Sequence, residues 1–510
     1  MFADLKCGTL AELESGRSWS SQEVAVRVAS RADAMRSHGL GRGDRLFILY
    51  GNKLEFFVDL LAAWNAGAGV VPVDHRLTPF EVENLARTVT PKIALVDATV
   101  PSGLGDALAA MGVKVLSSAE PTETIPAVLA HSLGCAARLD DEALILFTSG
   151  TTGVPKGVVH THRSLRARWF SLRQSLGIEC FQRTLCLLPT HFGHGLICNS
   201  LFPWLFGQDL VIASPFSPYL LLRLGPIIDE HNITFMSSVP SMWGLSLKGS
   251  KPPLGKSLRR IHCGSAPLSA HQWRQIREWS GIRAVYNAYG ITETASWVAG
   301  TSRENFEPED GLVGEPWGAA IKILKSPERQ APFADANECK VSETGYVWIN
   351  TPALMQGYFG QPELTDQVIS GGWFVTGDIG LVDDRGRFYL KGRERDEINK
   401  GGAKVYPTDV DAVVERFEHA IAVCTFAIAD PAYGQNVGMA VVLSRHDDAT
   451  LRQLHAWLKE HLAEFKIPQR WYVVDELPLN SRGKVSRNTV QELCALLKPV
   501  DLVRLLRRVS

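Results

Sequence analysis

The sequence predicts an α/β fold, with a large N-terminal body of covered sheets flanked by helices and a small mobile α+β C-terminal domain. Three observations support this prediction. Helical and strand-like segments alternate to about residue 390, several of the strand-like segments are almost continuously apolar, and the sequence becomes charged and glycine-flanked near Gly392. Continuously apolar strands are typical of sheets covered on both faces by helices.

The first elements follow from local start signals. Thr78, Pro79 and Glu81 have the pattern of an N-cap, a first-turn proline and a capping-box acid, which predicts a helix from residue 79. Ser20 or Ser21 is the expected cap of an earlier helix. Helices are therefore expected over 20–37 and 53–66 and from 79, and strands over 45–50, 69–74 and 92–97.

Further strands are expected through the middle of the chain, over 143–147, 208–213, 259–264 and 283–290. The richest apolar stretch, 185–212, is interrupted by Pro189, Asn199, Pro203 and Asp209. A membrane-spanning helix accepts such residues only at a high cost, so this stretch is interpreted as buried core.

The last part of the chain is a compact alternation of its own. Helices are expected over 410–417 and 451–463, and strands over 422–430, 438–443 and 470–477. A second domain of roughly 110 residues is within the usual size range. Its hydrophilic junction indicates that the two parts can move relative to each other.

Composition favours a small-molecule substrate. The 510 residues include 53 basic and 54 acidic side chains, so no overall field attracts nucleic acid or an anionic membrane. Nine scattered cysteines form no C-x-x-C pair, which fits a reducing compartment. Because the N-terminus carries acids where a signal peptide needs an apolar core, the expected location is cytoplasmic, with no integral membrane segment.

The stretch Leu146–His160, "LFTSGTTGVPKGVVH", is rich in glycine and hydroxyl residues after an apolar strand. Backbone N–H groups, hydroxyls and Lys156 could converge there on a phosphate chain. The spacing differs from a Walker loop, because Gly157 rather than Ser or Thr follows the lysine. The loop is either an ordinary turn or a different phosphate-binding loop.

Four other features are ambiguous when each is taken alone. Glu293 in "YNAYGITETAS" follows an apolar strand, where ligands bind in open α/β sheets, but it is also typical of a helix cap. Asp378 in "FVTGDIG" is equally typical of a turn. Arg393 and Lys484 could each be an ordinary solvated charge.

The ordered combination is more specific. "FTSGTTGVPKG", "YGITE", "TGD", "GR" followed by D-x-I, and a late G-K-x-x-R resemble the signature set of the adenylate-forming enzymes. These include acyl- and aryl-CoA ligases, adenylation domains and luciferases, and the CoA ligases are the most similar. The resemblance covers nearly the whole chain, including "GLGRGDR", "GAGVVPV" and "GLVGEP".

The resemblance implies a role for each matching position. The loop over the β- and γ-phosphates of ATP would be Thr148, Ser149, Gly150, Thr151, Thr152, Gly153 and Lys156. Adenine would lie between Gly264, Ser265, Ala266 and Pro267 on one side and Tyr289 and Gly290 on the other. Thr292 and Glu293 would belong to the catalytic set, with Glu293 holding Mg²⁺. Asp378 would bind the ribose with help from Arg393, and Lys484 would bridge the carboxylate and the α-phosphate.

The same resemblance implies domains over 1–392 and 396–510 joined by a hinge over 393–395. The hinge residue would be Arg395, where relatives commonly have Asp or Lys. After adenylation the small domain would swing, and Gly401 and Gly402 would face a channel for the pantetheine of coenzyme A or of a carrier protein.

The acyl pocket is expected between the phosphate loop and the adenine segment. Its candidate residues are His191, Phe192, His194, Val239, Gly264 and Ala288. Which of the two histidines faces the substrate is left open. Because Thr190–Trp204 contains no Asp or Glu, a free α-amino acid is disfavoured, since its buried ammonium would be unpaired.

The sequence therefore predicts an AMP-forming ligase that activates a small carboxylic acid as an acyl-adenylate and transfers it to CoA. One alternative is a stand-alone adenylation enzyme that loads a carrier protein. A non-catalytic nucleotide-binding homologue is a further alternative, and the oligomeric state, including a homodimer, is left open.

Overall fold

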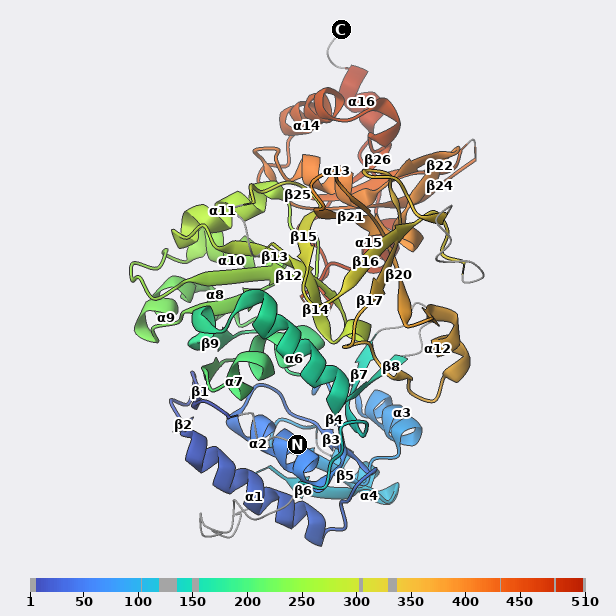
Figure 1. Cartoon of the computed structure of the whole chain (residues 1–510). Helices are drawn as coiled ribbons and strands as arrows, with labels where there is room; N and C mark the ends of the chain where they lie inside the picture. The colour runs from blue at the N-terminus through green and yellow to red at the C-terminus, as the bar shows by residue number, and fades with distance from the viewer. Residues whose placement is uncertain are drawn as a thin grey trace.

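The computed structural model describes residues 6–101, 103–118, 135–148, 156–301, 306–328, 337–431, 433–480 and 483–507. These residues form three sheets with helices packed around them (Figure 1). The sheet nearest the N-terminus lies at one end of the molecule, and the C-terminal sheet, drawn in orange and red, lies at the opposite end (Figure 1). The expected mixed α/β architecture is confirmed.

The N-terminal sheet has the strand order β18-β8-β7-β4-β3-β5-β6. Its strands are β3 (Arg45–Ile48), β4 (Gly69–Pro72), β5 (Ile93–Val96), β6 (Lys114–Ser117), β7 (Glu142–Thr148), β8 (Lys156–Thr161) and β18 (Gly357–Tyr358). The accompanying helices are α1 (Ser21–Ser37), α2 (Leu54–Ala66), α3 (Pro79–Val89) and α4 (Leu104–Ala110). Ser20 and Thr78 each close a capping box, with Glu23 and Glu81 respectively, as the start signals predict.

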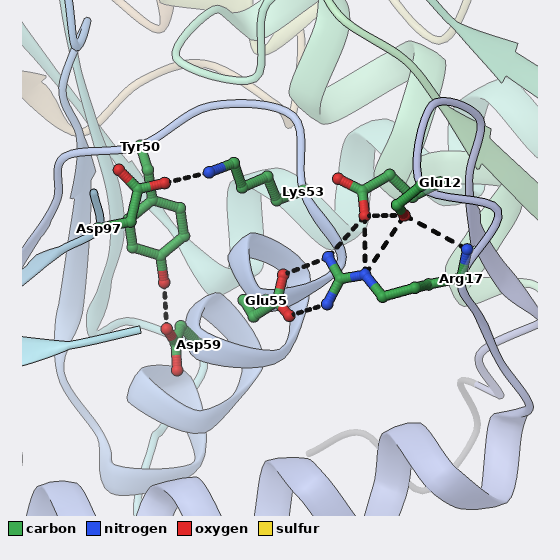
Figure 2. Close-up of polar contacts among 8 residues, drawn as sticks. Glu12, Arg17, Tyr50, Lys53, Glu55, Asp59 and Asp97 are labelled. Atoms are coloured by element: carbon green, nitrogen blue, oxygen red, sulfur yellow. Dashed lines mark hydrogen bonds and ion pairs between the residues drawn. The ribbon is translucent and has the colours of Figure 1, made fainter. Parts of the chain in front are cut away.

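The start of α2 is fixed by ion pairs that reach across this sheet. Figure 2 shows Lys53, the residue before the helix, paired with Asp97 after β5, and Tyr50 donating to Asp59 on the helix. Arg31 of α1 binds the same Asp59 carboxylate at 2.6 Å, with both side chains at most 4% exposed. Helices α1 and α2 and the segment after β3 are therefore joined by one buried carboxylate, which fixes the carboxyl end of this strand.

The central sheet contains most of the remaining body, in the order β16-β17-β20-β21-β15-β14-β13-β12-β11-β9-β10-β1-β2, with β19 beside β20. Its strands are β1 (Leu10–Glu12), β2 (Ser18–Trp19), β9 (Arg183–Cys186), β10 (Asp209–Ile212), β11 (Phe235–Ser238), β12 (Arg260–Gly264), β13 (Val285–Ile291), β14 (Ser296–Gly300), β15 (Leu312–Pro316), β16 (Ala320–Leu324), β17 (Gly345–Asn350), β19 (Ile369–Ser370), β20 (Trp373–Val382) and β21 (Phe388–Arg393). The run β10-β9-β11-β12-β13 is parallel, so the carboxyl ends of these strands meet at one edge.

Helices cover the central sheet (Figure 1). They are α6 (His162–Leu176), α7 (Phe202–Leu205), α8 (Pro218–Leu222), α9 (Leu224–Glu230), α10 (Pro240–Gly249), α11 (Ala270–Ser280) and α12 (Pro362–Val368). The apolar stretch 185–212 is mostly buried and includes a π-helical segment, η2 (His194–Leu201). In the part of the chain that the structure describes, no helix has the length and apolar character needed to span a membrane.

The C-terminal sheet has the order β23-β22-β25-β24, with β26 paired to β25. Its elements are β22 (Ile398–Lys400), β23 (Ala403–Val405), α13 (Pro407–Val414), β24 (Ala420–Asp430), β25 (Gly434–Leu443), α14 (Asp448–His461), β26 (Arg470–Val473), α15 (Arg487–Ala495) and α16 (Leu502–Arg507). The helix expected over 410–417 begins and ends three residues earlier, because Pro407 occupies its first turn. The helix expected from 451 begins at Asp448, because the Asp447 carboxylate caps it.

Candidate active site

Strands β7 and β8 form the base of the predicted phosphate loop. Thr148 pairs with Lys156 across the two strands, and the Thr148 hydroxyl lies 3.4 Å from the Lys156 carbonyl oxygen, which accepts its hydrogen bond. The two ends of the loop are therefore side by side. Ser149, Gly150, Thr151, Thr152 and Gly153, which the sequence assigns to the loop, lie outside the described residues.

A line of three side chains runs from this base to the predicted metal ligand. The Lys156 ammonium lies 5.4 Å from the centroid of the Tyr358 ring, and the Tyr358 hydroxyl donates to Glu293 Oε1 at 2.8 Å. Burial and the neighbouring Glu293 carboxylate raise the pKa of Tyr358, so the phenol remains a hydrogen-bond donor. Sequence analysis missed Tyr358, although the glycines around it in "GYFG" mark a turn close to the site.

The turn that carries Glu293, η3 (Thr292–Thr294), is hydrogen-bonded to two buried basic side chains, His160 and Arg168. His160 Nε2 lies 2.7 Å from the Thr292 carbonyl oxygen, and Arg168 donates to the Thr294 carbonyl at 3.1 Å. Burial lowers the pKa of His160 to about 4. The imidazole is therefore neutral at pH 7 and must carry its proton on Nε2, since a carbonyl oxygen only accepts.

Glu293 is a hard oxygen donor of the kind that Mg²⁺ prefers. Within the described ranges, no three His, Cys, Asp or Glu side chains gather closely enough to hold a metal ion by themselves. This donor set fits a magnesium ion that shares one protein carboxylate with the oxygens of a nucleotide.

Tyr289, Asp378 and Arg393 meet in the structure, and the contact between Tyr289 and Asp378 was not predicted from the sequence. The Tyr289 hydroxyl donates to Asp378 Oδ2 at 2.5 Å, and Arg393 Nε lies 3.0 Å from Asp378 Oδ1. Burial, followed by the charge of Asp378, raises the pKa of Tyr289 well above its usual value. The Asp378 side chain is only 2% exposed, so a nearly buried carboxylate is held by one neutral and one charged donor.

The adenine segment begins where β12 ends. Gly264 is in register with Ala288 of β13, and a Cβ atom at Gly264 would lie 2.2 Å from the Ala288 carbonyl oxygen. Only glycine fits this approach. Ser265 follows with a φ of +67°, a left-handed conformation that turns the chain at the carboxyl edge of the sheet.

The two candidate histidines of the acyl pocket point to different partners. His191 Nε2 lies 3.3 Å from Asp74 Oδ2, and its ring stacks on Phe192 with centroids 5.2 Å apart. His194 Nδ1 lies 2.8 Å from Ser265 Oγ, and its Nε2 lies 2.6 Å from Ser237 Oγ. His194 is therefore the imidazole that is joined directly to the adenine segment. Of the other predicted pocket residues, Val239 is buried directly after β11 and Ala288 is buried in the middle of β13.

The C-terminal domain reaches the same region through the loop that carries Lys484. The Ser241 hydroxyl donates to the Gly483 carbonyl oxygen, and a Cβ atom at Gly483 would lie 2.9 Å from the Phe216 ring. The pKa of His194 is lowered to about 3, mainly by burial and further by the charge of Lys484. The loop that carries Lys484 thus packs against the N-terminal body despite its distance in the sequence.

A second contact lies between the C-terminal domain and α11. Arg416, which follows α13, forms an ion pair with Asp310, and the same carboxylate accepts the backbone N–H of Ala270 at the start of α11 at 2.7 Å. The Thr408 hydroxyl also donates to the Lys391 carbonyl at 2.6 Å. These contacts fix one arrangement of the small domain on the body.

The predicted hinge and channel residues lie on the C-terminal side. Arg395 is in the short helix η5 (Glu394–Asp396), half exposed, with Nε 3.5 Å from Asp396 Oδ1. Gly401 and Gly402 form the turn between β22 and β23 and have φ values of +59° and +94°. They line a surface pocket with Asn399, Tyr433, Gly434 and Gln435. Their roles in domain motion and in pantetheine passage stay predictions.

Comparison with known proteins finds CoA ligases that match more than nine tenths of the chain. The feruloyl-CoA synthase of Amycolatopsis sp is 28% identical over 499 residues, covering 93% of this chain and 94% of that protein. A 2-succinylbenzoate–CoA ligase of Bacillus velezensis is 29% identical over 478 residues, covering 93% and 91%. The solved structure of Bacillus subtilis o-succinylbenzoate CoA synthetase with its acyl-adenylate intermediate matches with a TM-score of 0.81 and 26% identity, covering 96% and 95%.

Family models match both parts of the chain. The model described as AMP-binding enzyme matches residues 4–359, and the model described as AMP-binding enzyme C-terminal domain matches residues 409–484. The relatives are CoA ligases, which confirms the expected AMP-forming acyl-CoA ligase activity. The chain belongs to the AMP-binding enzyme family.

Proposed function

We propose that this ligase activates an aromatic carboxylic acid with Mg-ATP and transfers the acyl group to coenzyme A, with the site residues in the roles predicted from the motifs. The observation that carries the proposal is the position of Lys484. Its loop is hydrogen-bonded to Ser241, and its charge acts on His194, which is joined to the adenine segment. A cation at this point is suited to a carboxylate that approaches an α-phosphate.

The nucleotide would bind along the edge where β7, β12 and β13 end. Lys156 and the phosphate loop would neutralise the charge on the leaving pyrophosphate, and Asp378 would accept hydrogen bonds from the ribose hydroxyls. Glu293 would hold Mg²⁺, which supplies charge neutralisation on the phosphate oxygens when it is bound. His160 and Arg168 would position Glu293, because they hold the carbonyl groups on either side of it.

The reaction would need no acid, base or nucleophile from the protein. A carboxylate oxygen attacks the α-phosphorus in line, and pyrophosphate leaves. The thiolate of CoA then attacks the acyl carbon, and AMP leaves with the oxygen that came from the carboxylate. Lys484 and the loop contribute by positioning and by charge.

The aromatic class is inferred from the pocket and from the relatives. The aromatic side chains of Phe192 and Trp297 contact the two candidate histidines. Two of the curated relatives are named for feruloyl and 2-succinylbenzoyl groups, which are both aromatic, and two others for sulfoacetate and oxalate, which are not. A carrier-protein acceptor, a homodimer and a cytoplasmic location remain predictions from the sequence.

The test is ATP–pyrophosphate exchange with a panel of carboxylic acids, followed by mass spectrometry of the products formed with CoA. We expect exchange with aromatic acids at least about 10-fold above aliphatic acids of equal length, with AMP and an aroyl- or arylacyl-CoA as products. Exchange restricted to aliphatic acids would contradict the aromatic class. Exchange without a CoA thioester would contradict CoA as the acceptor.

A further inference from the structure

A short hydrogen-bonded chain crosses the predicted acyl pocket. It runs from Ser265 of the adenine segment, through both nitrogens of His194, to Ser237 near the end of β11, with distances of 2.8 and 2.6 Å. The Ser237 side chain is fully buried. His194 packs edge-on against Trp297, with ring centroids 5.6 Å apart, so one side of the imidazole is closed by an apolar ring.

This hydrogen-bonded chain contains one more N–H or O–H hydrogen than its two hydrogen bonds use. A neutral imidazole carries one N–H, and each serine carries one O–H, which gives three hydrogens for two hydrogen bonds. If Nε2 carries the proton, it donates to Ser237, and the Ser237 hydroxyl hydrogen is left. If Nδ1 carries it, the Ser265 hydroxyl hydrogen is left. Burial keeps His194 neutral at pH 7, since its pKa is about 3.

Two more polar side chains lie beside this chain without a partner among the described residues. His262 is the neighbour of Ser237 in the β11–β12 register, is fully buried, and has no hydrogen bond at either ring nitrogen. Trp297 is 2% exposed, and its Nε1–H, which can only donate, is also without a partner in the described part of the chain. Buried polar groups are rarely left unpaired in this way, so unpaired donors lie close to the Ser265–His194–Ser237 chain.

We infer that the aromatic acid of the proposed function carries an oxygen substituent, such as a hydroxyl, methoxy or carbonyl group, that accepts a hydrogen bond from the Ser265–His194–Ser237 chain. This inference rests on the proposed function and narrows its substrate class. An unsubstituted ring would leave the surplus donor buried and unpaired, whereas an oxygen substituent would pair with it. No carboxylate is present in Thr190–Trp204 to take that donor instead.

The test compares matched pairs of benzoic and cinnamic acids with and without a ring hydroxyl or methoxy group. For the native chain we expect kcat/KM in pyrophosphate exchange to be about 10- to 100-fold higher for the oxygenated member of the best pair. In a His194→Leu/Ser237→Ala double variant, which leaves only the Ser265 hydroxyl as a donor, this ratio should fall well below the native ratio and below that of Ser237→Ala alone, whatever the absolute rates. Ser237→Ala alone should give an intermediate ratio, because the imidazole still offers a donor.

Ser238→Ala is the matched control. Ser238 is the next residue on β11, and it bonds to Trp243 Nε1 and to the His262 carbonyl rather than to His194. This variant should keep the native ratio. A native ratio near one, or a ratio unchanged in the double variant, would overturn the inference but leave the aromatic ligase in place. Failure of every aromatic acid in the native chain would overturn the proposed function, and the inference with it.

Discussion

The two sides of the candidate site are built differently. On the body, Asp378 is 2% exposed and accepts from Tyr289, and Arg393 of the predicted hinge, 44% exposed, pairs with the same carboxylate. Glu293 accepts from Tyr358, and His160 and Arg168 bind the carbonyl groups of its turn. On the C-terminal domain, the Lys484 loop is attached through the Ser241–Gly483 hydrogen bond and packs against Phe216. The Arg416–Asp310 ion pair, with side chains 40% and 30% exposed, is the neighbouring contact.

This difference matches what two successive reactions need. Nucleotide groups that serve both steps are best held by buried contacts, which are costly to break. Under the proposed function Lys484 serves only adenylation and must leave before the thiol arrives, and exposed ion pairs such as Arg416–Asp310 oppose that movement little. Substitutions on the two sides should therefore affect the two half-reactions unequally, and the following predictions run from the largest expected effect to the smallest.

Lys484→Ala should reduce acyl-adenylate formation by at least about 100-fold, because the carboxylate and α-phosphate lose the cation that brings them together. Thioester formation from a supplied acyl-adenylate should remain within about 3-fold of the native rate. Single-turnover assays of each half-reaction measure both quantities. Lys498→Ala, at an exposed lysine of the same domain, is the control, and an equal loss in both half-reactions would show that the role of Lys484 is wrong.

Glu293→Ala should raise the Mg²⁺ concentration needed for half-maximal adenylation by about 10-fold or more, because a hard oxygen ligand is lost. Tyr358→Phe removes only the hydroxyl that donates to Glu293, so we expect a smaller shift in the same direction. Metal titrations of pyrophosphate exchange provide the measurement. An unchanged titration for Glu293→Ala would exclude it as a metal ligand.

His160→Gln should change how stability depends on pH. Burial lowers the pKa of His160 to about 4 in the folded chain, so between about pH 6.5 and pH 4 the unfolded chain binds the extra proton. The contribution of a neutral, buried His160 to the free energy of unfolding is therefore fully present above about pH 6.5. On acidification below that pH the free energy of unfolding falls by about 1.4 kcal/mol per pH unit. Glutamine does not titrate, so the native chain should lose about 2 kcal/mol relative to the variant between pH 6.5 and pH 5.

Denaturant unfolding at several pH values measures this difference. The control is His38→Gln, the same substitution at an exposed histidine outside the site. A free energy difference between His160→Gln and the native chain that does not change with pH would mean that His160 is not held neutral beside the turn of Glu293.

Ser241→Ala should have the smallest effect. It removes one hydrogen bond to the Lys484 loop, so we expect adenylation to fall by about 3- to 10-fold and thioester formation to stay unchanged. The control is Ser214→Ala, at an exposed serine two residues before Phe216. A loss confined to thioester formation would contradict docking of Lys484 for the first step.

The sequence predicted the parts of the site that depend on local pattern. Capping signals and apolar strands predicted elements of the fold, and the ordered motifs predicted roles for Lys156, Glu293, Asp378 and Lys484, because each stands in a short segment with its own signal. The fold class follows from the same periodicities. The start of α13 shows the limit of this reasoning. The apolar spacing predicted a start at residue 410, but the helix begins at Pro407, which is favoured in a first helical turn.

Contacts between distant segments could not be predicted in this way. Tyr358 meets Glu293 across 65 positions, and His160 meets the Thr292 carbonyl across 132. Such pairs depend on the packing of β18, β8 and the turn after β13 against one another. The local sequence of each segment does not predict that packing. The partners of His191 and His194 could not be predicted for the same reason, since Asp74 and Ser265 are distant in the sequence. Which of the two histidines faces the substrate stays open.

The most direct test of the account uses a substrate acid labelled with ¹⁸O in both carboxylate oxygens. The native chain is incubated with this acid, Mg-ATP and CoA, and the nucleotide products are resolved by mass spectrometry. If a carboxylate oxygen attacks the α-phosphorus and the thiol then displaces AMP, each AMP carries one ¹⁸O and the thioester keeps the other. Unlabelled AMP, or label in inorganic phosphate formed together with ADP, would contradict an acyl-adenylate and the assignment of Lys484 with it.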